Sequence, residues 1–199
     1  MHKVSEYSKS LELRIATAIN GAAIPSDDRS RIAGALFDIV HEHHRAVLVL
    51  LEKQLYGSAG SLLRSIFESY VRGVWFMKCA SEWDVEQFQK DIFKSGTFED
   101  RLKDIERVDG AAHGDLLTLK QKGWTALNSY THGGFRPVGR RFMGNELMAN
   151  YSEKEISEVE RMANAFSVLA VFQIGELSGN ANLSKDAETL AVEYMENYS

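Results

Sequence analysis

The sequence predicts an all-α protein, an up-and-down bundle of about six to eight helices. Apolar residues recur every three or four positions along most of the chain, which is the period of an amphipathic helix. The alternation of apolar and polar residues that is typical of a strand never extends beyond four residues. Only two prolines, Pro25 and Pro137, are present, so long uninterrupted helices are possible.

The length and composition fit one globular domain. The 199 residues are 44% hydrophobic and 26% charged, which is ordinary for a chain that buries a sizeable core. We therefore expect a single all-helical domain over residues 1–199, with its core at about 27–180 and flanking helices at both ends. The single cysteine, Cys79, excludes an internal disulfide and favours a reducing cytosol. Neither a signal peptide nor a membrane-spanning apolar run is visible, so we expect a cytoplasmic protein without a membrane partner.

In the first half of the chain, turn and capping residues divide the helical pattern into five segments. Gly21 and Pro25 end the first helix, and Gly57 closes the long second one. Thr97 with Asp100 resembles a capping box. We expect these helices at residues 4–22, 26–56, 58–80, 81–93 and 97–110.

In the second half, three more helices surround one long loop. Ser152 with Glu155 forms a capping box, and Ser184 with Glu188 is expected to cap the last helix. The glycine-rich residues 133–150 are predicted to be the only long loop. We expect the helices at residues 114–130, 152–178 and 184–198.

The charge is distributed unevenly. The net charge is −5, and residues 146–199 carry 3 bases and 10 acids, a balance of −7. In contrast, the thirty residues 116–145 carry five bases and no acid. General nucleic-acid binding by the whole surface is therefore not expected, but the acid-free window is a candidate site for an anionic ligand.

His132 is the first candidate within this window. It ends a predicted helix and precedes Gly133 and Gly134, where a ligand can approach closely. An imidazole can act as general acid, general base or phosphate donor near neutral pH. Ser129 and Asn128 lie one turn earlier and can face it. In the alternative interpretation, the two glycines simply end the helix, with His132 stabilising its C-terminus.

Three arginines follow within nine residues of His132, namely Arg136, Arg140 and Arg141. The planar fork of an arginine suits phosphate or carboxylate, so these residues are candidate ligand-binding groups. The alternative is a basic loop that contacts the acidic stretch at residues 153–160 of the same chain.

Arg64 and Glu68 are spaced four residues apart on the third predicted helix, beside its aromatic face. This spacing fits an ordinary helical salt bridge, and it also fits a pair that orients another polar group. If Glu68 points towards His132 in the fold, the second interpretation is favoured.

His41 and His44 lie at positions that could converge on one metal ion. The spacing of His43 and His44 from the apolar stripe of residues 36–51 also fits core-edge histidines that are hydrogen-bonded to a neighbouring helix. The HExxH and paired ExxH patterns are absent, so neither a metal nor any other cofactor is predicted.

Two segments resemble a group of bacterial all-helical proteins placed near the HEPN-like domains of prokaryotic defence and toxin–antitoxin systems. They are residues 61–68, which carry Arg64 and Glu68, and residues 129–134, which carry Ser129 and His132. The resemblance covers roughly residues 30–180. HEPN ribonucleases are helical bundles that commonly dimerise and cut RNA without metal, using paired motifs of arginine, a polar residue, three further residues and histidine.

The resemblance implies specific roles for several residues. Asn128 and His132 match the polar residue and the histidine of the motif, whereas Leu127 stands where the arginine belongs. Arg64, Arg136 or Arg140 would then have to supply the missing arginine. The expectation is a homodimer, paired through one of its long apolar helices, that binds RNA or a nucleotide, either as a metal-independent ribonuclease or as a degenerate binding form of one.

Two other classes of function stay open. One is a metal-binding enzyme that uses His41, His44, Glu68 and His132 as ligands. The other is a non-enzymatic module of the antitoxin or immunity type, which would form a complex with a partner protein.

Overall fold

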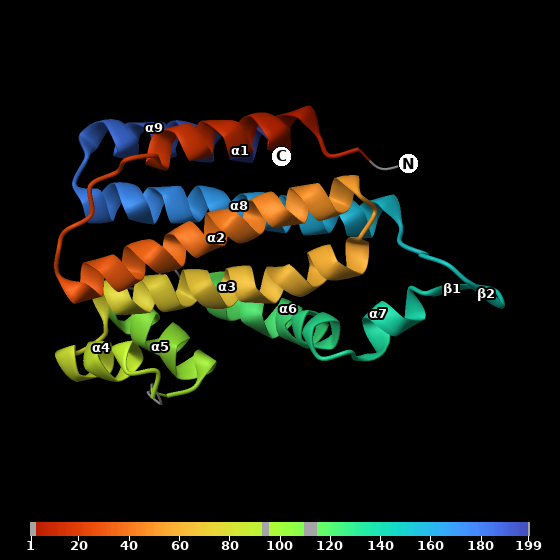
Figure 1. The fold of residues 1–199 in the computed structure, drawn as a ribbon, viewed down its shortest axis with the longest axis horizontal. Helices are drawn as coiled ribbons and strands as arrows, with labels where there is room; N and C mark the ends of the chain where they lie inside the picture. Colours follow the sequence, from red (N-terminus) through yellow and green to blue (C-terminus); the bar gives the residue numbers. More distant parts are fainter. Residues whose placement is uncertain (1–2, 93–95, 110–114, 199) are drawn as a thin grey trace.

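The computed structural model describes residues 3–92, 96–109 and 115–198, and over these residues it is an all-α protein with one small hairpin (Figure 1). The nine helices of these residues are α1 (Glu6–Ile19), α2 (Asp28–Glu52), α3 (Tyr56–Lys78), α4 (Glu82–Gln89), α5 (Phe98–Asp109), α6 (Asp115–Thr131), α7 (Phe135–Gly139), α8 (Glu153–Ser178) and α9 (Ala181–Tyr198). Strands β1 (Phe142–Met143) and β2 (Glu146–Leu147) form the hairpin.

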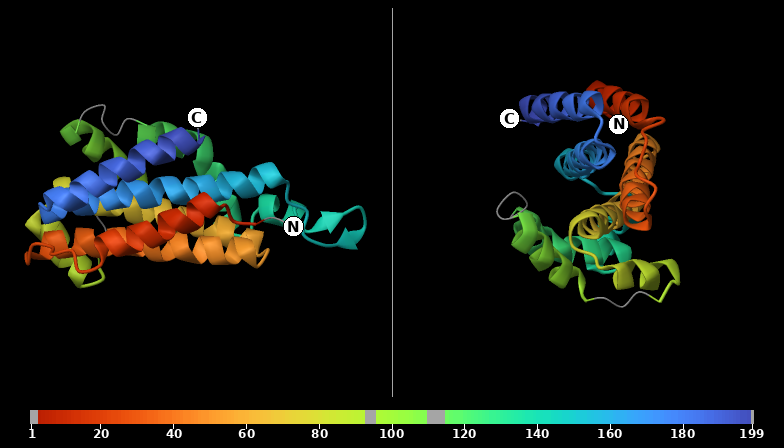
Figure 2. Two further views of the ribbon diagram at one scale, coloured as in Figure 1. Left: turned by 90° about the horizontal axis from the view of Figure 1, so that it is seen from above. Right: turned by 90° about the vertical axis from the view of Figure 1, so that its left-hand side faces the viewer.

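The helices are arranged in layers around α2, α3 and α8. Helices α1 and α9 cover one side of these long helices, and α4, α5 and α6 cover the other (Figures 1 and 2). Both α1 and α9 contribute fully buried side chains, so the core extends beyond the expected 27–180. None of the described helices combines the length and apolar character that a bilayer-spanning segment needs.

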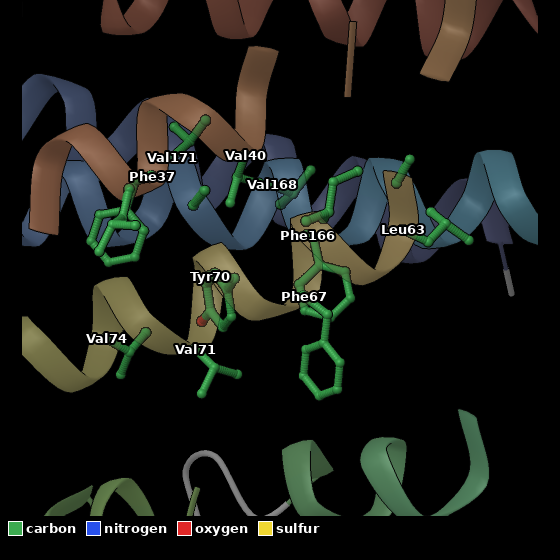
Figure 3. Packing of buried hydrophobic residues seen from close by; sticks show 14 of the residues in the cluster. Phe37, Val40, Leu63, Phe67, Tyr70, Val71, Val74, Phe166, Val168 and Val171 are labelled. Carbon is green, nitrogen blue, oxygen red and sulfur yellow. The ribbon is translucent and has the colours of Figure 1, made fainter. Parts of the chain in front are cut away.

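Aromatic residues form the centre of the core. Phe67 and Phe166 have ring centroids 5.2 Å apart, and Tyr70 lies 5.5 Å from Phe166 (Figure 3). Phe37 of α2 reaches Gly73 of α3 so closely that a Cβ atom there would lie 2.6 Å from its ring. The apolar stripes predicted for these helices therefore meet inside one cluster.

Capping side chains define the N-termini of most of the described helices. Ser152 and Glu155 form the predicted capping box of α8, and Thr97 bonds with Asp100 at the start of α5 in the same reciprocal way. The predicted start of the last helix at Ser184 is wrong. The side chain of Asn180 accepts from the backbone N–H of Leu183 at 3.3 Å, and the helix begins at Ala181.

The predicted long loop at residues 133–150 is also wrong, because it contains ordered structure. Helix α7 occupies its first part, and in the hairpin Phe142 pairs with Leu147 and Met143 with Glu146. Gly144 has a φ of +61° at the first central position of the turn, which a two-residue hairpin loop requires. The expected helix boundaries at residues 93, 110 and 114 lie outside the described residues.

A polar network joins α1 to α8 inside the bundle. The His44 Nε2–H group donates to Asn164 at 2.7 Å, because the amide oxygen can only accept. Asn164 in turn donates to Ser8 at 2.7 Å, and Ser8 donates to the buried carboxylate of Glu160. Each buried side chain of this network thus forms a hydrogen bond with the next residue in it.

Candidate functional site

Arg64 and Glu68 form a partly buried ion pair on α3. The Arg64 Nε group donates to Glu68 Oε1 at 2.7 Å, and the two side chains retain 20% and 29% of their exposure. One helical turn separates the residues, so the pair forms within α3 alone. This contact fixes the plane of the guanidinium.

The same guanidinium reaches His132 at the end of α6. Its Nη1 group contacts His132 Nε2 across 68 residues of sequence. A guanidinium has no acceptor, so Nε2 accepts and the ring proton of the neutral imidazole lies on Nδ1. Arg64 therefore bridges Glu68 and His132. This arrangement favours a pair that orients another polar group over an isolated salt bridge.

Close packing of α3 against α6 brings Arg64 near His132. Gly60 leaves room for the ring of Tyr130, since a Cβ atom at Gly60 would lie 3.1 Å from that ring. The Ser61 hydroxyl donates to the backbone carbonyl of Tyr130 at 3.0 Å. The close approach places the C-terminal turn of α6, and with it His132, beside Arg64.

The ring of Trp124 lies against the guanidinium of Arg64. The Arg64 Cζ atom lies 5.0 Å from the centroid of the Trp124 ring, within the range of a cation–π contact. Phe98 of α5 stacks on Trp124 at 4.6 Å with an interplanar angle of 11°. We call Arg64, Glu68, Trp124 and His132 the Arg64 cluster.

The turn after His132 is organised by Ser129. The Gly134 N–H donates to the Ser129 carbonyl at 2.7 Å, and the Ser129 hydroxyl accepts from the backbone N–H of Arg136 at 3.0 Å. Gly134 must be glycine here, because a Cβ atom would lie 2.5 Å from that hydroxyl. Ser129 thus positions the turn, and its hydroxyl is engaged by α7.

Asn128 lies one turn before His132 on α6. Its backbone carbonyl accepts from the His132 N–H at 2.9 Å. Its side-chain oxygen is buried and has no hydrogen-bond partner among the described residues. No hydrogen bond joins Asn128 to Arg64 among the described residues, so its expected part in the site depends on the shared helix face alone.

The three arginines after His132 do not form one cluster. Arg140 forms an ion pair with Glu155 of α8, its Nε donating at 2.7 Å, and this carboxylate raises the pKa of Arg140. This pair agrees with the alternative of a contact with the acidic stretch. Arg141 packs over Gly57, whose Cβ would lie 3.0 Å from the guanidinium, and Arg136 is exposed on α7.

His41 and His44 of α2 lie in the core, away from the Arg64 cluster. Helices α2 and α6 pack on opposite sides of α3 (Figure 1). His41 Nδ1 shares a hydrogen bond with Ser167 Oγ at 2.9 Å, and both His41 and His44 are almost fully buried. Burial lowers the pKa of His41 to about 3 and that of His44 to about 4. No group of three or more His, Cys, Asp or Glu in the described part of the chain is placed to hold a metal ion. The ligand set of the metal-enzyme alternative is therefore not brought together.

The fold and this geometry define a helical protein with an Arg–Glu–His cluster at its surface. Residues 37–199 match the model of a family described as "Family of unknown function (DUF6988)", and the chain belongs to that family. The matched range contains the whole Arg64 cluster and leaves α1 outside. No curated protein and no solved structure matches the chain.

Proposed function

We propose that this protein binds an anionic ligand, an RNA or a nucleotide, at the Arg64 cluster. The contact between Arg64 and His132 carries the proposal, because it joins an arginine and a histidine from distant parts of the chain, and both are residue types that can bind phosphate. Glu68 and Trp124 hold the guanidinium in one orientation. A fixed guanidinium loses little freedom when it receives a phosphate, which favours binding.

Charge and access around the cluster agree with this proposal. The Arg64 Nη2 group takes part in neither the contact with Glu68 nor that with His132. Gly133 has open space around the position of a Cβ atom, and His132 is exposed. The acid-free window that contains Trp124 and His132 carries five bases and no acid, in contrast to the net charge of −5.

Stability alone gives a weaker account of the cluster. A salt bridge that is partly open to solvent contributes about 0–1 kcal/mol to the free energy of unfolding. The pair of Arg64 and Glu68 would make this contribution without a histidine beside it. The contact with His132 adds an imidazole beside a cation at the surface. Such an arrangement is useful when both groups meet the same anion.

The cluster also contains groups suited to metal-independent RNA cleavage. In that reaction the ribose 2′-oxygen attacks the adjacent phosphorus, its proton passes to a base, and the 5′-oxygen leaves with a proton from an acid. His132 would serve as base or acid, and Arg64 would stabilise the charge on the phosphorane. Arg64 would thereby replace the arginine missing at Leu127, and Glu68 would act as its positioning residue.

Binding of a fluorescein-labelled single-stranded RNA, followed by anisotropy and by competition with ADP, tests the proposal. We expect Arg64→Gln and His132→Ala to weaken binding about tenfold or more each, with affinity falling as salt rises. Arg107→Gln is the matched control, because Arg107 is an exposed helical arginine paired with Asp104. Equal affinity of Arg64→Gln and Arg107→Gln would contradict the proposal. Release of cleaved RNA by the wild type, but not by His132→Ala, would add catalysis to binding.

A second candidate function is the non-enzymatic protein-interaction module. The exposed apolar side chains around the hairpin favour it, since a surface of that kind marks contact with another macromolecule. In that case His132→Ala would leave the protein complex unchanged. Retained complex formation together with lost RNA binding would show that the two functions use different surfaces.

A further inference from the structure

An ordered arm extends from the bundle between α6 and α8. It comprises α7 and the β1–β2 hairpin, residues 135–150, and its hairpin projects beyond the end of the long helices (Figures 1 and 2). The Met148 N–H donates to the Arg141 carbonyl at 2.8 Å and the Asn150 N–H to the Arg140 carbonyl at 2.9 Å, which continues the hairpin ladder towards the bundle. Every residue from Arg141 to Asn150 is exposed. The hairpin part of the arm is thus a regular structure with its side chains in solvent.

The exposed side chains of the arm are mainly large and apolar. Six of them occur within fourteen residues, with exposed fractions of 83% for Phe135, 49% for Val138, 49% for Phe142, 55% for Met143, 77% for Leu147 and 41% for Met148. A two-stranded hairpin is only marginally stable in water without a third element to cover it. A concentration of apolar surface on a projecting arm indicates a contact with another macromolecule.

The charge of the arm restricts which surface can cover it. It carries Arg136, Arg140 and Arg141 against a single acid, Glu146. Arg140 is already paired with Glu155, and the guanidinium of Arg141 packs over Gly57, which leaves the exposed Arg136 as the arm's available cation. A complementary surface is therefore apolar with carboxylates beside it.

The outer face of α9 has this composition. Val192 and Met195 are 50% and 58% exposed, and the exposed Glu188 and Glu196 flank them. The spacing of these four residues puts them on one side of the helix. They belong to the part of the chain with a balance of −7. In Figure 2 the arm projects beyond the end of the bundle while α9 lies along it, so a chain's arm extends away from its own α9.

We propose that the arm docks on the outer face of α9 of a second copy of this chain. Because each copy has one arm and one such face, two equivalent contacts related by a twofold axis close a homodimer. This interface differs from the expected pairing through a long apolar helix, since the apolar stripes of α2, α3 and α8 are buried within each chain. It does not depend on ligand binding at the Arg64 cluster.

Sedimentation equilibrium and light scattering of the full chain test the assembly. We expect the wild type to have twice the 22.4 kDa mass of one chain. The double variant Phe142→Ser/Leu147→Ser should weaken dimerisation about tenfold or more with an unchanged circular dichroism spectrum, because neither side chain contributes to the core. The matched control is Leu13→Ser/Val108→Ser, which removes two equally exposed apolar residues and should leave the dimer intact.

Crosslinking identifies the surface that receives the arm. A variant with photoreactive benzoylphenylalanine in place of Leu147, mixed with isotopically labelled wild type, should form an adduct with residues 188–196 of the labelled copy.

The charge of α9 gives a second test. Glu188→Lys/Glu196→Lys should weaken the dimer about tenfold, and rising salt should weaken the wild-type dimer. A monomeric wild type, a dimer indifferent to the arm substitutions, or an adduct on any other surface would overturn the proposal. Binding of a monomer to phosphatidylserine vesicles through the arm would overturn it too, in favour of a lipid surface.

Discussion

Trp124 lies beneath the guanidinium of Arg64, with the Arg64 Cζ atom 5.0 Å from its ring centroid, although the two residues come from different helices. The stack of Trp124 on Phe98 and the contact of Phe98 with Phe67, at 5.1 Å, continue this support into the core. Aromatic packing that continues into the core therefore supports the position of the surface arginine, together with the ion pair to Glu68.

Replacing Trp124 by leucine should affect both stability and the Arg64 cluster. The substitution removes the stack with Phe98 and the ring under Arg64, and we expect a loss of about 2 kcal/mol in the free energy of unfolding. Urea denaturation measures this loss, and RNA binding by the same variant should weaken. Trp83→Leu is the control, because Trp83 is 59% exposed, and its effect should stay within about 0.5 kcal/mol.

A pair of glycine substitutions should change stability in opposite directions. Gly73→Ala places a methyl group 2.6 Å from the Phe37 ring and should destabilise the fold by about 2 kcal/mol. Gly123→Ala in α6 meets nothing within 4 Å and should stabilise by up to about 1 kcal/mol through helix propensity. Thermal unfolding of both variants distinguishes these effects. A neutral Gly73→Ala would show that α2 and α3 are not packed as closely as described.

The Ser8 hydroxyl should stabilise the attachment of α1. It donates to Glu160 at 2.5 Å and accepts from Asn164 at 2.7 Å, and Ser8 is fully buried. Ser8→Ala leaves both partners with one hydrogen bond fewer, at a cost of about 1–3 kcal/mol. Hydrogen exchange should show faster opening of α1 than in the wild type. Ser10→Ala, at an exposed position of the same helix, should have no comparable effect.

Stability should fall as the pH drops below about 6.5. The ordinary pKa of histidine is about 6.5, whereas burial lowers that of His41 to about 3 and that of His44 to about 4. Between these values the unfolded chain binds protons that the folded chain does not, so the contribution is fully present above pH 6.5 and declines as the pH falls to about 4 for His44 and about 3 for His41. Urea unfolding at a series of pH values measures this slope.

Substitution identifies the histidines responsible. His41→Leu should reduce the slope, because leucine binds no proton in either state, whereas His43→Gln, at a half-buried position, is the control. If the slope were the same in His41→Leu and the wild type, burial of a neutral His41 would not be its source.

Local sequence patterns determined most of the helices. The capping box of Ser152 with Glu155 and the apolar stripe of α3 are local signals, and both were confirmed. The hairpin was not predicted, because its strands are two residues long and fall below the length at which alternation is recognisable. The start of α9 was misplaced because Asn180, rather than Ser184, caps the first turn.

The candidate site was predictable only in part. The proximity of Arg64, Glu68 and His132 was raised as a question by the sequence, and the structure brings the three together. Trp124 was missed, although its spacing of eight residues from His132 puts both on one face of α6. Phe98 could not be assigned to the site, since only tertiary packing brings α5 against α6.

The central claim is that the Arg64 cluster receives an anion, and NMR of the full chain during titration with ADP tests it most directly. We predict that the side-chain Nε–H signal of Arg64 and the ring signals of His132 shift together and saturate, while the Nε–H signal of Arg107 stays in place. Saturable shifts at other residues with Arg64 and His132 unmoved, or no saturable shift at all, would contradict the account.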